Sequence, residues 1–154
     1  MNDSVEMAAS LCRTFEGLRL APYLCPRGYW TIGYGSRFLA NGAAVTARTP
    51  PITAPQADTL LQLTLQRLLP EVRQLVHGAL SSGCEAALLD FAFNLGLTAL
   101  AGSTLIKLLN AGHAAEAAGQ LLLWDHIHKN GQLIALPGLT RRRQAEWQLW
   151  TESA

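Results

Sequence analysis

Near the start of the chain, apolar residues recur at three- and four-residue steps: Val5, Ala8, Leu11, Cys12 and Phe15. This spacing predicts an amphipathic helix, with Ser4 as its N-terminal cap and Gly17 as the residue that ends it. Glu16 then lies at the carboxyl end of the helix, where unpaired carbonyl groups disfavour a negative charge.

The helical period is absent from residues 22 to 35. Here the turn-forming letters CPRG separate Tyr23 and Leu24 from the β-favouring YWTIGYG, so we expect a small hairpin. The polar, proline-ended segment from Ser36 to Pro51 is too long for a plain connection. It is expected to extend this small lobe or to flank a cleft.

The helical period returns after the polar segment. Thr53 with Gln56, and Ser82 with Glu85, have the spacing of capping boxes and predict the starts of two helices. Pro70 falls within the first of them and is expected to break or kink it.

The rest of the chain is also mainly helical in pattern. Gly96 is placed to end the second of these helices, and further helices are predicted at residues 103–112, 113–124 and 140–150. Residues 128–139 are predicted to form a turn-rich connection. The sequence thus predicts an α+β, mainly helical single domain over residues 1–154, with a small β lobe at about 17–52 and a cleft beside it.

Composition supports a compact domain. Apolar residues make up 49% of the chain and charged residues 15%, which argues against disorder. The net charge of +1 gives no global field for nucleic acid. The run Arg141 to Arg143 would spread around a helix, which favours solvated or internally paired side chains. The first ten residues lack a secretory pattern and no apolar run reaches membrane length, so we expect a soluble protein without stable membrane insertion.

The three cysteines have no metal-binding spacing such as C-x2-C. We therefore expect neither a disulfide framework nor a bound metal, and the pattern indicates no cofactor.

Glu16, Cys25 and Thr31 have the spacing E-x8-C-x5-T and run from the end of the first helix across the hairpin. Here the chain resembles the phage-type lysozymes, glycoside hydrolase family 24, whose pattern is E-x8-D-x5-T followed by IGYG. Further matching segments are TIGYG, IT..QA at Ile52 to Ala57, FNLG at 93–96, STL..LLNAG at 103–112 and GL..RR..E...W at 138–150.

The resemblance implies a lysozyme-like fold that cleaves peptidoglycan between N-acetylmuramic acid and N-acetylglucosamine. Glu16 would be the general acid, and its place at a helix carboxyl end favours the protonated form. The family also implies an arginine partner for this carboxyl, with Arg142 the best match and Arg143 the second. Such a partner favours the charged form instead.

Cys25 departs from the family pattern, which usually has aspartate at this position. A thiolate carries negative charge and is a strong nucleophile, and Arg27 nearby would increase its ionised fraction. Attack by the thiolate on the anomeric carbon would retain configuration, whereas action through water would invert it. The alternative is that Cys25 is a small hydrophobic residue in a turn.

The other expected site residues surround this pair. Thr31 would orient the attacking water, or it is simply a β-favouring residue in the hairpin. Phe93 and Asn94 match the FNLG segment and are expected to contact an N-acetyl sugar, although Phe93 alone would more often be core. Ser36 and Arg37 follow GYG and are expected at the edge of the groove.

Three expectations concern residues outside this motif. Cys12 lies one turn before Glu16, so a disulfide to Cys25 that masks the active-site thiol is a conceivable redox switch. We otherwise expect Trp124, Trp147 and Trp150 to belong to the core. The same reading applies to the histidines: His77, His113, His126 and His128.

The leading functional hypothesis is a monomeric endolysin that waits in the bacterial cytoplasm and reaches the wall through lesions made by a holin. One rival is a lytic transglycosylase, which needs a single acid/base carboxylate. The other is a wall-binding homologue that lost catalysis with its aspartate.

Overall fold

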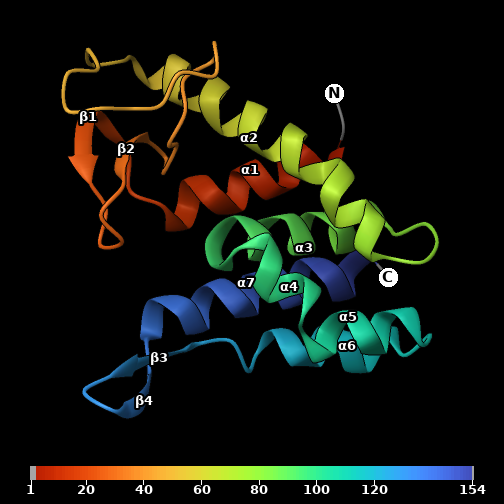
Figure 1. Ribbon diagram of the computed structural model, residues 1–154. Coiled ribbons are helices and arrows are strands. Elements are labelled where there is room, and N and C mark those ends of the chain that lie inside the picture. Colours follow the sequence, from red (N-terminus) through yellow and green to blue (C-terminus); the bar gives the residue numbers. More distant parts are fainter. Residues whose placement is uncertain (1–2, 154) are drawn as a thin grey trace.

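In the computed structural model, which describes residues 3–153, helix α3 (Ser82–Leu95) lies at the centre of a helical body (Figure 1). Every residue from Gly83 to Ala92 is buried. The helix packs against α1 (Asp3–Phe15) on one side and α7 (Pro137–Ser153) on another. A helix buried on all sides needs apolar residues all round, and apart from Glu85 and Asp90 the buried residues of this segment are small or apolar.

The remaining helices complete the body around α3. None of the helices within residues 3–153 combines the length and the hydrophobicity that crossing a bilayer requires. In chain order these remaining helices are α2 (Ala54–Leu75), α4 (Leu97–Ala101), α5 (Thr104–Asn110) and α6 (Ala114–Leu121).

The small lobe is built on an antiparallel hairpin of β1 (Arg19–Leu24) and β2 (Trp30–Gly33). A second, smaller core of Ile32, Val45 and Leu60 joins this lobe to α2. The predicted fold class, mainly helical with a small β lobe, is confirmed.

The predicted helix starts are partly confirmed. Thr53 caps α2 as expected: its hydroxyl accepts from the Gln56 N–H at 3.2 Å, and the Gln56 side chain accepts from the Thr53 N–H at 2.9 Å. Ser4 was expected to cap α1 but lies inside that helix, where its buried hydroxyl donates to Glu85 Oε1. A cap must precede the helix, so the expectation for Ser4 is wrong.

The start of α3 is displaced by one residue from its prediction. Ser81 is the cap, and its hydroxyl accepts from the Cys84 N–H at 3.3 Å. Glu85 does not complete a capping box with Ser82, because its carboxylate pairs with Arg73 at 2.8 Å. Gly96 ends the helix as predicted.

Two further elements extend or correct the sequence prediction. Of the two expected effects of Pro70, a break does not occur, because α2 continues to Leu75; a kink stays a prediction. The connection over residues 128–139 contains most of a second hairpin, β3 (His126–Lys129) with β4 (Gln132–Ala135), whose strands are exposed. Asn130 and Gly131 both have positive φ, 52° and 74°, so the turn that the sequence predicted here is the turn of a hairpin, whose strands the prediction did not include.

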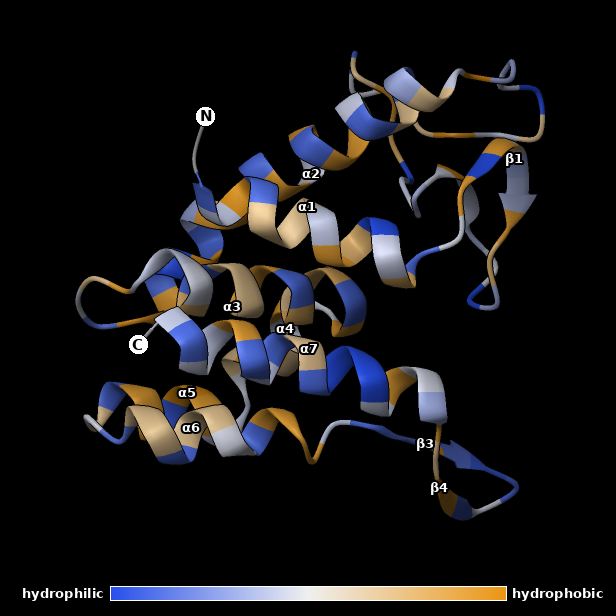
Figure 2. Cartoon of the chain, turned by 180° about the vertical axis from the view of Figure 1, so that it is seen from behind, coloured by the Kyte–Doolittle hydropathy of each residue, from blue (hydrophilic) through white to orange (hydrophobic). Residues whose placement is uncertain are grey.

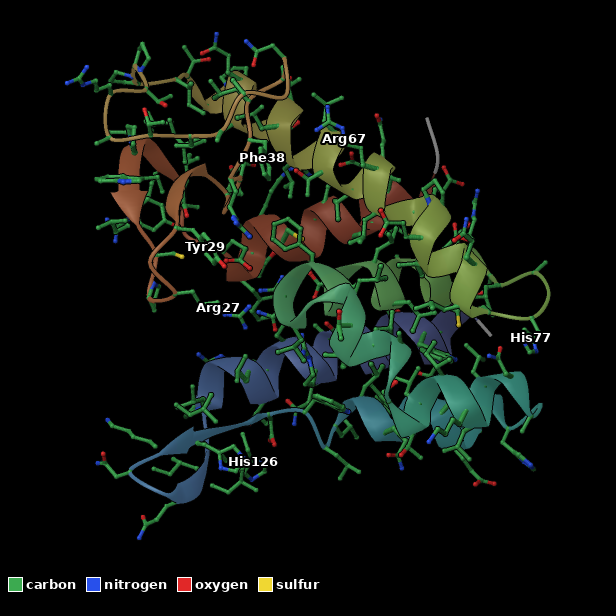
Figure 3. All side chains as sticks on the ribbon, viewed as in Figure 1. Arg27, Tyr29, Phe38, Arg67, His77 and His126 are labelled. Atoms are coloured by element: carbon green, nitrogen blue, oxygen red, sulfur yellow. The ribbon has the colours of Figure 1, made fainter. Side chains whose placement is uncertain are left out.

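The tryptophans and histidines are less buried than expected. Trp150 is in the core, and Trp124 packs edge-on against Phe91 with 5.3 Å between ring centroids. Trp147 is 40% exposed, and Figure 3 shows His77 and His126 at opposite ends of the molecule. The core expectation is therefore wrong for Trp147 and for the four histidines, all of which lie on the surface: His77, His113, His126 and His128.

Close packing between α3 and α7 makes Gly83 a sensitive position. A Cβ atom there would lie 2.5 Å from the Leu149 carbonyl oxygen and 2.2 Å from Ser153 Oγ. We expect Gly83→Ala to lower the free energy of unfolding by about 1 to 3 kcal/mol, because the two helix backbones must separate. Chemical denaturation measures this, with Gly119→Ala in α6 as the control, since nothing lies within 4 Å of a Cβ at Gly119. Equal stability of the two variants would contradict the close approach.

Candidate active site

A cleft of about 510 Å³ lies between the β lobe and the helical body. Glu16, Cys25 and Thr31 all line it, although they come from the end of α1, the hairpin turn and β2. In Figure 3 the labelled side chains Arg27, Tyr29, Phe38 and Arg67 lie around this part of the molecule. The structure therefore brings the three residues of the E-x8-C-x5-T pattern to one cavity. The other predicted site residues on its wall are Ser36, Arg37 and Phe93.

Glu16 is the residue directly after α1, and its N–H still donates to the Cys12 carbonyl at 2.7 Å. Its side chain is 27% exposed, and Oε1 accepts from Arg142 Nη1 at 2.7 Å. Of the two arginines considered, Arg142 is therefore the one that pairs with Glu16. This arrangement fixes one carboxyl oxygen against the protein interior.

The second oxygen of Glu16 lies beside a glycine turn. Gly35 has φ of +95°, and a Cβ there would lie 4.0 Å from Glu16 Oε2 and 3.8 Å from the Phe93 ring. A side chain at this position would occupy the space between the carboxyl and the aromatic ring, and its backbone would be strained. Glycine therefore leaves room for a ligand next to Oε2.

Arg142 is itself held by a carboxylate that the sequence analysis missed. Asp90 of α3 accepts from Arg142 Nε at 2.9 Å and from Nη2 at 2.8 Å, and both side chains are almost fully buried. Burial alone would raise the pKa of Asp90, but the hydrogen bonds and charge of Arg142 outweigh it and lower that pKa. The signal in the sequence is a single carboxylate within the apolar segment AALLDFAF, because a buried charge requires a partner.

Arg143 has a different set of partners. Its Nη2 lies 2.6 Å from Glu146 Oε1 and 2.9 Å from Asn94 Oδ1. Asn94 was expected to contact the sugar, but it is not among the residues that line the cleft. Because its amide oxygen is bound to Arg143, we revise its role to support of the helix interface. Figure 2 shows the hydrophilic block near the start of α7 that contains these arginines.

Cys25 lies at the end of the β1 strand, where the chain turns. Its N–H donates to the Tyr29 carbonyl at 2.9 Å, and its carbonyl accepts from the Gly28 N–H at 2.8 Å. The backbone amide of Tyr29, followed by the amide of Arg27 and the Thr31 hydroxyl, lowers the pKa of the Cys25 thiol against a smaller opposing effect of burial. Arg27 thus contributes through its backbone amide. A lower pKa increases the thiolate fraction near neutral pH.

Thr31 is buried beside Cys25. Its hydroxyl donates to the Tyr29 carbonyl at 3.0 Å, and it is one of the groups that lower the pKa of the Cys25 thiol. A hydroxyl has one proton, so it donates either to the carbonyl or to the sulfur. Donation to the sulfur stabilises the thiolate.

The redox expectation for Cys12 is not met. All three cysteines are free, and Cys12 is fully buried with its Sγ donating to Asp90 Oδ1 at 3.2 Å. Burial, followed by the charge of Asp90, raises the pKa of Cys12 far above its ordinary value. Cys12 thus faces the interior network and forms no disulfide with Cys25.

The outer part of the cleft is aromatic and cationic. Tyr29 and Phe38 are 45% and 50% exposed, and the Arg37 guanidinium lies 3.5 Å from the centre of the Tyr29 ring. Within residues 3–153, no carboxylate pairs with Arg27, Arg37 or Arg67. The sequence analysis did not single out Tyr29, Phe38 or Arg67, because their shared position depends on how the hairpin meets α2.

Comparisons with known proteins find relatives over most of the chain. The sequence model of the family described as phage lysozyme matches residues 13–146. The chain is 36% identical to the endolysin of Acyrthosiphon pisum secondary endosymbiont phage 1, with 97% of each chain covered. Among solved structures, it resembles the muramidase domain of SpmX from Asticaccaulis excentricus at 37% identity with a TM-score of 0.80, covering 93% of both chains. It also resembles a variant of P22 lysozyme at 31% identity with a TM-score of 0.78, covering 94% of both chains.

Proposed function

The chain belongs to the phage lysozyme family, and we propose that it is a muramidase of the endolysin type that hydrolyses the β-1,4 bond between N-acetylmuramic acid and N-acetylglucosamine. The observation that carries this proposal is the shared cleft of Glu16, Cys25 and Thr31, with Arg142 bound to the back of Glu16. Phe93, Ser36 and Arg37 are proposed to contact the sugar rings.

Glu16 is the proposed general acid. When it is protonated, Oε2 donates its proton to the glycosidic oxygen as the bond to the anomeric carbon breaks. The carboxylate that remains accepts a hydrogen bond from Arg142, which stabilises the new charge. Because the negative charge on Glu16 develops next to the Arg142 guanidinium, departure of the leaving sugar is favoured.

Cys25 is proposed to take the role that aspartate usually has in this family. In one route the thiolate attacks the anomeric carbon, forming a C–S bond that water later hydrolyses with Glu16 as the base. In the other route water attacks, and the thiolate accepts its proton while Thr31 orients it. Proton NMR of the first-formed anomer distinguishes retention from inversion, and mass spectrometry of the enzyme detects a glycosyl adduct.

One observation favours a second candidate function. Glu16 is the only carboxylate among the described residues that line the cleft, which suits a lytic transglycosylase. Such an enzyme leaves 1,6-anhydro ends, which weigh one water less than hydrolysed ends. Mass spectrometry of digested peptidoglycan therefore separates the two reactions, and anhydro products would replace the hydrolase proposal. If neither product forms and the protein still binds sacculi, the chain is a wall-binding homologue instead.

Arg27, Arg37 and Arg67 form a cationic rim around the cleft, which predicts a charge-dependent interaction with the substrate. We expect Arg67→Ala and Arg37→Ala each to lower kcat/KM on sacculi about 10-fold, because each removes a charged hydrogen-bond donor from the cleft. The loss is expected to shrink at high salt, which screens the peptidoglycan carboxylates. Arg48→Ala is the matched control, because Arg48 is exposed and does not line the cleft. Equal losses in all three variants would contradict a specific role for the rim.

We further propose that the protein acts as a monomer and stays in the host cytoplasm until a holin opens the membrane. The endolysin designation of its relative supports a role in lysis of the host. Expression in a bacterial host with and without a holin tests it, with lysis expected only in the presence of the holin. Size-exclusion chromatography with light scattering tests the monomer.

A further inference from the structure

Behind Glu16, a cluster of charged side chains lies wholly inside the helical body. Asp90, Arg142, Arg143 and Glu146 are each 3% exposed or less. They form a chain from α7 through α3 to the cleft: Glu146 contacts Asp90, Asp90 binds Arg142, and Arg142 binds Glu16. Buried charges of this kind are costly unless each has a partner.

Glu146 has one oxygen with a partner and one without. Oε1 accepts from Arg143 Nη2 at 2.6 Å, whereas Oε2 is buried and has no hydrogen-bond partner in the structure. The Asp90 side chain is a neighbour of the Glu146 carboxyl and contributes to raising its pKa. Two carboxylates are both acceptors, so this contact is favourable only if one of them carries a proton.

Asp90 is not the group that carries the proton. Both of its oxygens accept hydrogen bonds from Arg142, and such a bidentate pair requires Asp90 to be ionised. Burial, followed by the neighbouring Asp90 carboxylate, raises the pKa of Glu146 well above its usual range. The free Oε2 is therefore the site of the proton, which is available for a hydrogen bond to Asp90.

We propose that Glu146 is a neutral carboxylic acid and that, with Asp90, it positions Arg142 for Glu16. Glu146 donates its proton to Asp90, Asp90 holds Nε and Nη2 of Arg142, and Nη1 is left to face Glu16. Both residues are positioning residues, because neither lines the cleft. The positioning role rests on the proposed function, in which Glu16 is the general acid.

The charge balance supports the neutral form. When Glu16 is ionised, as it is after it has donated its proton, Arg142 and Arg143 together balance Asp90 and Glu16, so a proton on Glu146 leaves the cluster neutral. In that state an ionised Glu146 would leave an uncompensated charge in the interior. The titratable and charged groups facing Glu16 are Cys12 of α1, Asp90 of α3, Arg142 of α7, Tyr23 of β1, and Cys25, Arg27, Arg37 and Arg67 around the cleft.

The protonation state can be measured without catalysis. Carboxyl-selective ¹³C NMR of protein labelled in glutamate is expected to show one carboxyl resonance that stays at the protonated shift through neutral pH. This resonance is expected to disappear in Glu146→Gln. If every glutamate resonance titrates below neutral pH, the neutral Glu146 is wrong, whether or not the protein degrades peptidoglycan.

The positioning role is tested by pH profiles of three variants on dye-labelled sacculi. Glu146→Gln can still donate to Asp90, so it is expected to rescue the wild-type pH profile and most of kcat. Glu146→Ala is expected to lower kcat with little change in KM, by a factor on the order of 100. Asp90→Asn removes a negative charge, so Arg142 favours ionised Glu16 more strongly and the alkaline limb moves about one unit to lower pH.

Two results would overturn the positioning role. One is a Glu146→Gln variant as impaired as Glu146→Ala, and the other is a folded Asp90→Asn variant with the wild-type pH profile. Thermal melting establishes folding for each variant. Inactive wild-type protein would count against the proposed function, and the NMR result would still decide the protonation of Glu146.

Discussion

Glu16→Gln is expected to lower the rate of peptidoglycan cleavage by about 100- to 10,000-fold while the protein stays folded. Glutamine cannot supply the proton that the leaving oxygen needs. Its amide oxygen can still accept from Arg142 Nη1, so the buried guanidinium keeps a partner. The loss is therefore expected in kcat and not in stability.

Dye release from labelled sacculi measures this loss, and thermal melting measures folding. Glu71→Gln on α2 is a matched control, because Glu71 is exposed and does not line the cleft. The control is expected to cleave at the wild-type rate. A Glu16→Gln variant that clears sacculi as fast as Glu71→Gln would remove Glu16 from the mechanism.

Cys25→Ala is expected to produce the next largest effect, a loss on the order of 100-fold, because it removes the group opposite the acid. Cys25→Asp restores the carboxylate usual in the family and is expected to keep activity.

Iodoacetamide is expected to inactivate the wild type through Cys25, because Cys12 and Cys84 are buried. Cys25→Asp serves as the control for alkylation, since it has no thiol at this position. Full activity of Cys25→Ala would return Cys25 to the role of a small turn residue.

The pH profile gives a second readout of Cys25. The thiolate is the active form, so activity rises as pH rises through the pKa of Cys25, which the backbone amide of Tyr29 lowers. In Cys25→Asp this acid limb is expected at lower pH, because an aspartate ionises at about pH 4. An unchanged acid limb would show that another group controls it.

The fold and the core of the site could be predicted from local patterns. Glu16, Cys25 and Thr31 lie close together in the sequence, at the end of one helix and in the hairpin that follows it. Predicting these two neighbouring elements was therefore sufficient to predict that the three side chains share a site. Capping at Thr53 and the end of α3 at Gly96 followed in the same way from short-range chemistry.

The rest of the site depends on contacts between distant segments. Asp90 and Arg142 are separated by 52 positions in the sequence, and no periodicity pairs them. Asn94 matched a family segment, but whether its amide faces the cleft or Arg143 is decided by how α3 packs on α7. The β3–β4 hairpin was missed for another reason: its strands are exposed, so they lack the alternating pattern of a half-buried sheet.

The measurement that tests the account most directly is a double-mutant comparison of cleavage rates for the wild type, Glu16→Gln, Cys25→Ala and the double variant. If both side chains act on the same glycosidic bond, their effects are not additive, and the double variant should be about as slow as Glu16→Gln alone. A double variant slowed by the product of the two single losses, or a Cys25→Ala variant with the wild-type rate, would contradict a shared site.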